Sequence, residues 1–302
     1  MPGRFRMSRD WRDWVVAQAV VALLWLGTRL GYRTRVRWLG WVVGRAIAPL
    51  SGFPARIRAN LALVCPELSR TEVRRITREV PVNAVRTLLE LHSGADFRAV
   101  AAAARVRGAE HLAAVEAAHA EGRPVILISG HFGNYDVPRA ALAARGIPVG
   151  GLYRPLKNRF YNRIYAETIA AISGPVFARG RRGLAEMVKF LREGGVVGLL
   201  IDQRMAHGVP LKFFGHPAWT ALSAAEMAVK YDALILPVYG RRLADGVNFE
   251  LVAEAPLALG DPAEMTQALN DSLERMVRAD MDQWLWFHRR WKDPHGPAPG
   301  TA

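Results

Sequence analysis

Short apolar runs alternate with helical stretches through the second half of the chain. The runs fall at residues 125–128, 147–153, 195–201, 233–240 and 247–252, and turn-forming residues bound them. Between them lie stretches with helical spacing, such as "GLAEMVKFLREGG" and "ALSAAEMAVKYD". This alternation predicts an α/β fold with a mixed, mostly parallel sheet flanked by helices.

The sequence before these strands is mainly helical in pattern. Residues 54–92 have apolar positions at helical spacing, and Pro66 breaks the pattern into two helices. An alanine-rich stretch, 97–124, then predicts a strand, a turn and a helix that lead into the run at 125–128. We expect residues 54–302 to form one domain, and residues 1–53 to form a separate region.

An apolar stretch at residues 15–27 follows four arginines. As a helix it covers about 20 Å, which is shorter than the roughly 30 Å hydrocarbon core of a bilayer. A signal peptide is the alternative, but the residues after Gly27 restore positive charge and offer no small-residue cleavage site. We therefore expect a retained membrane anchor, with the body of the protein on the cytoplasmic side.

A second apolar segment, 38–53, contains tryptophans with arginines at intervals. This composition is typical of a helix that lies in the headgroup region of a membrane. A pair of core helices is the other interpretation of these two N-terminal segments.

The composition sets limits on partners and chemistry. A net charge of +14 predicts attraction to polyanions such as anionic lipid, an acidic protein or nucleic acid. The single cysteine, Cys65, excludes an internal disulfide and a multi-cysteine zinc site. The histidines show no metal-ligand spacing, and we expect neither a metal nor a cofactor.

The stretch "VILISGHFGNYDV", residues 125–137, carries the candidate chemistry. A buried strand ends near His131, and a helix begins after Asn134 or Asp136. This places His131 and Asp136 across a strand-to-helix turn, where the carboxylate could orient the imidazole as a general base. In the simpler alternative, His131 packs and Asp136 only caps the helix.

Other catalytic motifs are absent from the sequence. It contains no phosphate-binding G-x-x-x-x-G-K-[ST] loop, no G-x-S-x-G nucleophile elbow and no H-E-x-x-H zinc helix. Ser129 precedes His131 too closely for a serine-nucleophile elbow. Direct attack by a substrate hydroxyl therefore fits better than a covalent enzyme intermediate.

"SGHFGNYDV" resembles the H-x-x-x-x-D block of the glycerolipid and lysophospholipid acyltransferase superfamily. Further blocks, in order, resemble its lipid A late acyltransferase branch, the lauroyl and myristoyl acyltransferases. These blocks are "LYRPLKNRFYNR", "RGRRGLAEMVKFLREGGVVGLLIDQ", "FFGHPAWT" and "WLWFHRRWK". Together they cover most of residues 105–292.

The resemblance implies an enzyme that moves a fatty acyl chain from acyl carrier protein to a hydroxyl of a lipid A precursor. It would act at the cytoplasmic face of a bacterial inner membrane, with an anionic bilayer and no nucleic acid as partner. His131 would deprotonate the hydroxyl, and Asp136 would orient His131. The implied substrate-binding residues are Gly133, Asn134, Arg154, Arg179, Arg181 and Asp202, with Arg181 the better match to the family's site arginine.

Some positions leave alternatives open. Asp202 resembles the family's second acidic position, but Gln203 departs from the commoner acidic continuation. "FFGHPAWT" could line an acyl channel or close the core, and "WLWFHRRWK" could pack on the sheet or lie at the membrane interface. Another glycolipid or phospholipid acceptor would use the same catalytic pair. A non-catalytic basic membrane protein is a further alternative.

Overall fold

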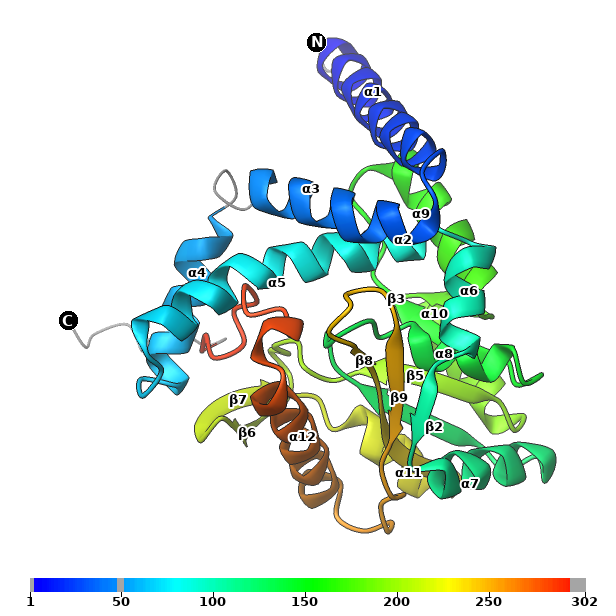
Figure 1. Ribbon diagram of the computed structural model, residues 1–302. Coiled ribbons are helices and arrows are strands. Elements are labelled where there is room, and N and C mark those ends of the chain that lie inside the picture. Colours follow the sequence, from blue (N-terminus) through cyan, green and yellow to red (C-terminus); the bar gives the residue numbers. More distant parts are fainter. Residues whose placement is uncertain (1–2, 48–51, 294–302) are drawn as a thin grey trace.

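A seven-stranded sheet forms the centre of the protein (Figure 1) in a computed structural model that describes residues 3–47 and 52–293. Its strand order is β1-β9-β8-β2-β5-β3-β4, and all neighbours are parallel except β8 and β9. The strands are β1 Arg105–Arg107, β2 Val125–Ser129, β3 Val149–Tyr153, β4 Val176–Ala178, β5 Val196–Leu200, β8 Leu234–Arg242 and β9 Phe249–Ala253. The predicted mixed, mostly parallel sheet is confirmed, and the five predicted runs match strands to within two residues.

Helices cover both faces of this sheet. The side chains of β2 point alternately to the two faces and so enter two separate cores. Val125 and Leu127 pack with residues of α7 and α8, whereas Ile126 and Ile128 pack with residues of α10, α11 and α12. The flanking helices are α6 Ala95–Ala102, α7 Ala109–Ala120, α8 Val137–Ala143, α9 Arg159–Ile172, α10 Arg181–Arg192, α11 Ser223–Tyr231 and α12 Pro262–Ala279. The strands are thus buried on both sides, which explains their continuous apolar runs.

The "FFGHPAWT" block forms a hairpin that the sequence pattern did not predict. Strands β6 Val209–Phe213 and β7 His216–Thr220 pair antiparallel beside the main sheet. Phe213 and Phe214 at its turn are buried in one cluster with Trp284 and Trp286. The block therefore closes the core, and neither phenylalanine lines the cavities described below.

The C-terminal "WLWFHRRWK" block follows a short 3-10 helix, Met281–Gln283, and runs through the protein interior. Trp284 and Trp286 are fully buried, and their rings contact each other edge to face. The interfacial interpretation is thus wrong for these two tryptophans. Side chains of α4 Phe53–Val64 hold the block, since Asn60 donates hydrogen bonds to the carbonyl oxygens of Trp286 and His288.

The N-terminal helices lie across one side of the body, and α1 projects from it (Figure 1). They are α1 Gly3–Thr28, α2 Tyr32–Thr34, a π-helix at Arg35–Leu39, and α3 Gly40–Ile47. Among residues 3–47 and 52–293, no single helix combines the length with the apolar content that crossing a bilayer requires. The predicted anchor 15–27 lies inside α1, and part of the predicted segment 38–53, residues 48–51, lies outside the described residues.

The predicted break at Pro66 falls between α4 and α5 Arg70–Leu91. Ser69 and Glu72 form a reciprocal capping box that begins α5. The helix α3 packs along α5, where Gly44 lies against the backbone of Val82 and lets the two helices approach closely. The predicted domain boundary at residue 53 stays a prediction.

A buried ion pair ties α5 to the central sheet. Glu90 on α5 and Arg242 at the end of β8 form a bidentate pair, and both side chains are almost fully buried. Glu90 also accepts a hydrogen bond of 2.8 Å from the side-chain amide of Asn134, which follows β2. The pair therefore fixes the loop after β2 as well as α5.

Glu90→Gln should lower the free energy of unfolding by about 3–5 kcal/mol, because it leaves the buried Arg242 cation without its counter-charge. Chemical denaturation measures this change. Glu186→Gln removes a carboxylate from an exposed pair with Arg182 and should cost less than about 1 kcal/mol. Equal losses for the two variants would contradict this view of the Glu90–Arg242 pair.

Candidate active site

The candidate site forms where two neighbouring parallel strands end. β2 and β5 pair in register, with Ser129 opposite Leu200. His131 lies two residues after the end of β2, and Asp202 lies two residues after the end of β5. The carboxyl ends of parallel strands meet at the same edge of a sheet, so the register itself brings the imidazole and the carboxylate together.

Asp202 holds both the ring and the backbone of His131. Its Oδ1 lies 2.8 Å from Nδ1 of the imidazole, and its Oδ2 accepts a bond of 2.7 Å from the His131 backbone N–H. Oδ2 also accepts a bond of 2.8 Å from the indole N–H of Trp284. With Nδ1 donating to this carboxylate, Nε2 keeps a lone pair that can accept a proton.

The electrostatics of the pair favour an ionised Asp202 and a basic His131. Burial lowers the pKa of His131, but the charge and hydrogen bond of Asp202 outweigh burial and raise that pKa above its ordinary value. Burial raises the pKa of Asp202, whereas the positive charge and hydrogen bonds of His131 hold it well below its usual range. The arrangement suits a general base that is oriented by a carboxylate.

Asp136 lies at the predicted place but makes a different contact. It is the N-cap residue of α8, and its carboxylate pairs with Arg139 at 2.6 Å in a buried ion pair. Arg139 also donates to the carbonyl oxygen of Ser173. Asp136 contributes to the raised pKa of His131 through its charge. The hydrogen bond that orients the imidazole thus comes from Asp202, where the sequence analysis expected Asp136.

Two of the expected substrate-binding residues shape the loop that carries His131. Gly133 has a φ of 55°, and a Cβ at this position would collide with the carbonyl oxygen of Gly240. Asn134 is buried and is held by Glu90, by the Gly240 carbonyl oxygen and by the backbone N–H of Asp136. Gly133 lines the smaller cavity described below, whereas Asn134 lines neither cavity.

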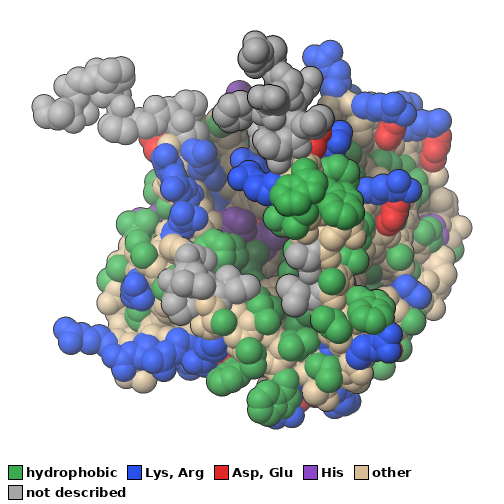
Figure 2. All heavy atoms as spheres, turned by 90° about the horizontal axis from the view of Figure 1, so that it is seen from above, with side chains coloured by type: hydrophobic (Ala, Val, Ile, Leu, Met, Phe, Trp, Pro, Cys, Tyr) green, Lys and Arg blue, Asp and Glu red, His purple; other side chains and the backbone are tan. Residues whose placement is uncertain are grey.

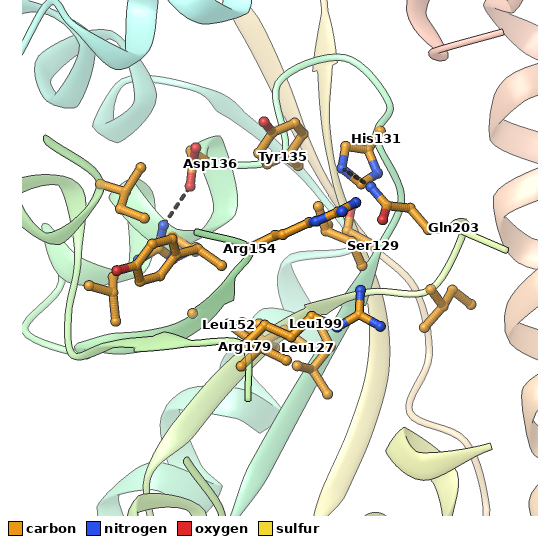
Figure 3. A pocket seen from close by; sticks show the side chains of 18 of the residues that line it. Leu127, Ser129, His131, Tyr135, Asp136, Leu152, Arg154, Arg179, Leu199 and Gln203 are labelled. Atoms are coloured by element: carbon orange, nitrogen blue, oxygen red, sulfur yellow. Dashed lines mark hydrogen bonds and ion pairs between the residues drawn. The ribbon is translucent and has the colours of Figure 1, made fainter. Parts of the chain in front are cut away.

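A cavity of about 660 Å³ opens beside His131 (Figure 3). Its volume falls in the range of typical small-molecule sites. Apolar side chains from the strands and from α9 and α11 line much of it, among them Leu127, Leu152, Ile169, Val176, Leu199, Ile201 and Ala224. The side chain of Gln203 also lines it, with its amide nitrogen 3.3 Å from Nε2 of His131.

Cations gather on the lining of this cavity. Arg154, Lys157 and Arg179 are exposed residues that contribute to it, and Figure 3 shows the Arg154 side chain extending in the direction of His131 and Gln203. Figure 2 shows histidine side chains at the base of a hollow with Lys and Arg side chains near its rim. Arg181, the first residue of α10, is exposed and lines neither cavity.

A second cavity of about 290 Å³ also reaches His131. It lies between residues of α5, such as Leu88 and Leu91, and residues of α9, such as Tyr161 and Tyr165. Tyr135, whose pKa burial raises well above its ordinary value, lines both cavities as an un-ionised phenol. The two cavities meet at His131 and also share Tyr135, Asp136, Leu156 and Tyr165 in their lining.

Comparison with known proteins identifies the family. The sequence model of the family described as "Bacterial lipid A biosynthesis acyltransferase" matches residues 2–293. The chain belongs to this family. The protein is therefore an acyltransferase of lipid A biosynthesis, and the resemblance found in the sequence is confirmed.

Individual relatives agree with this assignment. The lipid A biosynthesis lauroyltransferase of Escherichia coli K12 is 28% identical over 94% of this chain and 92% of its own length. A lipid A biosynthesis acyltransferase of Haemophilus influenzae is 26% identical over 60% of this chain and 56% of its own. A phosphatidylinositol mannoside acyltransferase of Mycobacterium tuberculosis is 27% identical over 62% and 59%.

Sequence reasoning missed two features of the candidate site. The first is the role of Asp202, which was expected to bind substrate and instead bonds to the His131 imidazole. Its position two residues after a strand that could pair with β2 was a signal for this contact. The contact of Trp284 with Asp202 joins residues 82 positions apart, and no local pattern could reveal it.

Asp202→Asn should lower the pKa of His131 below its ordinary value of 6.5, because burial then acts without the carboxylate's charge. Carbethoxylation of His131 as a function of pH, followed by peptide mass spectrometry, measures this pKa. Asp136→Asn should lower it less, and should instead reduce the free energy of unfolding by leaving Arg139 unpaired. A larger pKa decrease in Asp136→Asn would contradict the assignment of Asp202.

Proposed function

We propose that this acyltransferase moves a fatty acyl chain from acyl carrier protein to a hydroxyl of a lipid A precursor, with His131 as general base and Asp202 as its orienting carboxylate. One observation carries the mechanism: Nδ1 of His131 is bonded to a buried carboxylate, while the ring lines two cavities. Nε2, whose contact in the structure is the Gln203 amide nitrogen at 3.3 Å, is therefore the nitrogen that a substrate hydroxyl would reach by displacing that amide.

The reaction is a direct acyl transfer. The hydroxyl proton passes to Nε2 of His131 as the oxygen attacks the thioester carbonyl carbon, and the resulting imidazolium is stabilised by Asp202. The tetrahedral oxyanion lies near the cations that line the larger cavity, of which Arg154 extends toward His131 (Figure 3). Collapse breaks the carbon–sulfur bond, and the imidazolium returns its proton to the thiolate.

Asp136 serves the same reaction less directly in this proposal. Its pair with Arg139 anchors the start of α8 and so fixes the loop between His131 and the helix. Its charge adds to that of Asp202 in raising the pKa of His131. We therefore propose Asp136 as a supporting member of the catalytic group, held out of direct contact with the imidazole by Arg139.

The larger cavity suits the acyl chain of the donor. Much of its lining is apolar, and Gly151 and Gly198 on neighbouring strands leave space that the side chain of Arg139, another lining residue, partly occupies. Arg154 and Arg179 suit the phosphate groups of the donor or acceptor. Arg181, which is exposed and outside the cavity, suits the acidic surface of acyl carrier protein better than the reacting centre.

The N-terminal helices suit attachment to an anionic membrane. Exposed large apolar side chains are concentrated on α1, the turn after it, the π-helix and α3, and comprise Trp11, Trp14, Val15, Val16, Trp25, Leu26, Leu30, Trp38, Trp41 and Val42. Arginines accompany them, and Arg29 and Arg45 lie over the rings of Trp25 and Trp41. We propose that residues 1–53 lie on the cytoplasmic face of the bacterial inner membrane and hold the domain 54–302 there.

A phosphatidylinositol mannoside or another lipid is the alternative acceptor, favoured by the mycobacterial relative that bears this activity in its name. The relative covered over nearly its whole length is instead the lipid A lauroyltransferase. Incubating the purified enzyme with acyl carrier protein donor and each acceptor separately, followed by lipid mass spectrometry, decides between them. We expect the lipid A precursor to gain one acyl chain.

His131→Ala should reduce the rate of acyl transfer by about two to four orders of magnitude, which is the usual contribution of a general base. Steady-state transfer to the lipid A precursor measures this loss. The variant should still fold, because the His131 side chain is partly exposed to solvent. Transfer at a near-normal rate in the folded variant would contradict the role of His131.

Trp38→Ser combined with Trp41→Ser should weaken binding to vesicles that contain anionic lipid, because it removes two exposed aromatic side chains from the proposed membrane face. Vesicle flotation measures the bound fraction. Leu184→Ser, a change of similar exposure on α10, is the matched control and should bind as the wild type does. Equal flotation of all three proteins would exclude this face as the attachment site.

A further inference from the structure

The C-terminal block is bonded to the catalytic loop at several points. Leu285 donates its backbone N–H to the carbonyl oxygen of His131, at 3.2 Å. Gly133 donates to the carbonyl oxygen of Gln283 at 2.9 Å, and Phe132 and Trp284 form an antiparallel bridge. The backbone of the block therefore follows the loop that carries His131.

Trp284 adds a side-chain contact to Asp202. Its indole N–H donates to Oδ2 of Asp202 at 2.8 Å, and both residues are fully buried. The indole groups of Trp286 and Trp291 instead donate to backbone carbonyl oxygens, those of Met281 and Phe213. Trp284 thus acts on the carboxylate that orients the imidazole.

The two carboxylate oxygens of Asp202 accept hydrogen bonds from different donors. Oδ1 accepts from Nδ1 of His131, whereas Oδ2 accepts from the His131 backbone and from Trp284. A carboxylate can rotate about its Cβ–Cγ bond, and two donors on Oδ2 from separate segments oppose that rotation. Each donor also stabilises an anion that is fully buried.

We propose that Trp284 is a positioning residue of the acyl transfer: its indole N–H holds the Asp202 carboxylate in the orientation that keeps His131 aligned with Nε2 toward substrate. This inference rests on the proposed function and adds to it a residue from the C-terminal block. Trp284 itself lines neither cavity.

Loss of the indole donor also has a definite electrostatic direction. The N–H dipole offsets part of the negative potential that Asp202 exerts on His131, so its removal should raise the pKa of His131 further. The other groups that face the pair remain in place: Asp136, the un-ionised Tyr135 and Tyr239, His288 and the buried Arg290. Burial, with the charge of His131, lowers the pKa of His288 to about 4, so His288 stays neutral near pH 7.

The test compares Trp284→Phe with Trp286→Phe. Both variants lose an indole from the same buried cluster and one hydrogen bond from its N–H. Only Trp284→Phe removes a hydrogen bond to the Asp202 carboxylate. We expect Trp284→Phe to lower kcat about 10-fold or more and to move the acidic limb of the kcat/KM profile to higher pH. Trp286→Phe should leave that limb at the wild-type pH.

A replacement of Trp284 that keeps the shape of its side chain distinguishes loss of the hydrogen bond from loss of the fold. Substitution of 3-benzothienylalanine for Trp284 keeps the bicyclic ring but exchanges the N–H for sulfur, so packing is retained while the donor is lost. It should reproduce the kinetic change of Trp284→Phe with little change in the unfolding midpoint. An unchanged kcat and an unchanged acidic limb in this protein would overturn the proposal.

A double-mutant comparison locates the effect at Asp202. If Trp284 acts through the carboxylate, adding Trp284→Phe to Asp202→Asn should lower kcat much less than it does in the wild type. Fully additive losses would overturn the proposal by showing that the indole acts through packing alone. Acyl transfer by the wild type is the reference in every comparison, so failure of the proposed function would appear as an inactive wild type and not as a silent Trp284 variant.

Discussion

The Asp202 carboxylate is the constraint on which the site depends. A buried anion is costly unless hydrogen bonds and counter-charge replace the water it loses. Three N–H groups supply these bonds: the imidazole and backbone of His131 and the indole of Trp284. Because these donors come from two segments far apart in sequence, stabilising Asp202 also joins the end of β2, the end of β5 and the C-terminal block.

The surrounding structure explains how the loop after β2 keeps its shape. Asn134 is bonded to Glu90, which in turn pairs with Arg242, and Asp136 is bonded to Arg139. These buried pairs fix the loop at residues that Asp202 does not contact. The imidazole is thus held by a rigid frame, whereas its Nε2 remains beside two cavities. Such a frame is what a general base needs, since proton transfer depends on a fixed distance to the substrate hydroxyl.

The sequence predicted the fold well because its strands are buried on both faces and give continuous apolar runs. It also placed His131, since a polar residue directly after a buried strand is conspicuous. It assigned the orienting carboxylate to Asp136 because that residue is close in the chain. The actual hydrogen bond to Asp202 depends on which strand pairs with β2, and strand order is a long-range property that a local pattern does not contain. The hairpin of β6 and β7 was missed for a local reason, since Pro210 and Pro217 interrupt the alternation of apolar and polar residues in its strands.

The same reasoning separates the arginines. The sequence favoured Arg181 over Arg154 and Arg179 as the site arginine. The folded chain shows that Arg154 and Arg179 line the larger cavity, while Arg181 begins α10 outside it. The C-terminal block has aromatic and basic residues in a pattern that suits a membrane interface. Trp284 and Trp286 of this block lie in the core instead, and Trp284 contacts Asp202 and the loop of His131.

The central claim is that Asp202 fixes the tautomer of His131 so that Nε2 is the basic nitrogen. Nuclear magnetic resonance of protein with ¹⁵N-labelled histidine, with the His131 signals identified by their absence in His131→Ala, tests this most directly. At a pH above the pKa of His131, we predict that Nδ1 carries the proton and Nε2 is unprotonated, and that Asp202→Asn weakens this preference. A neutral His131 protonated at Nε2 in the wild type would contradict the account.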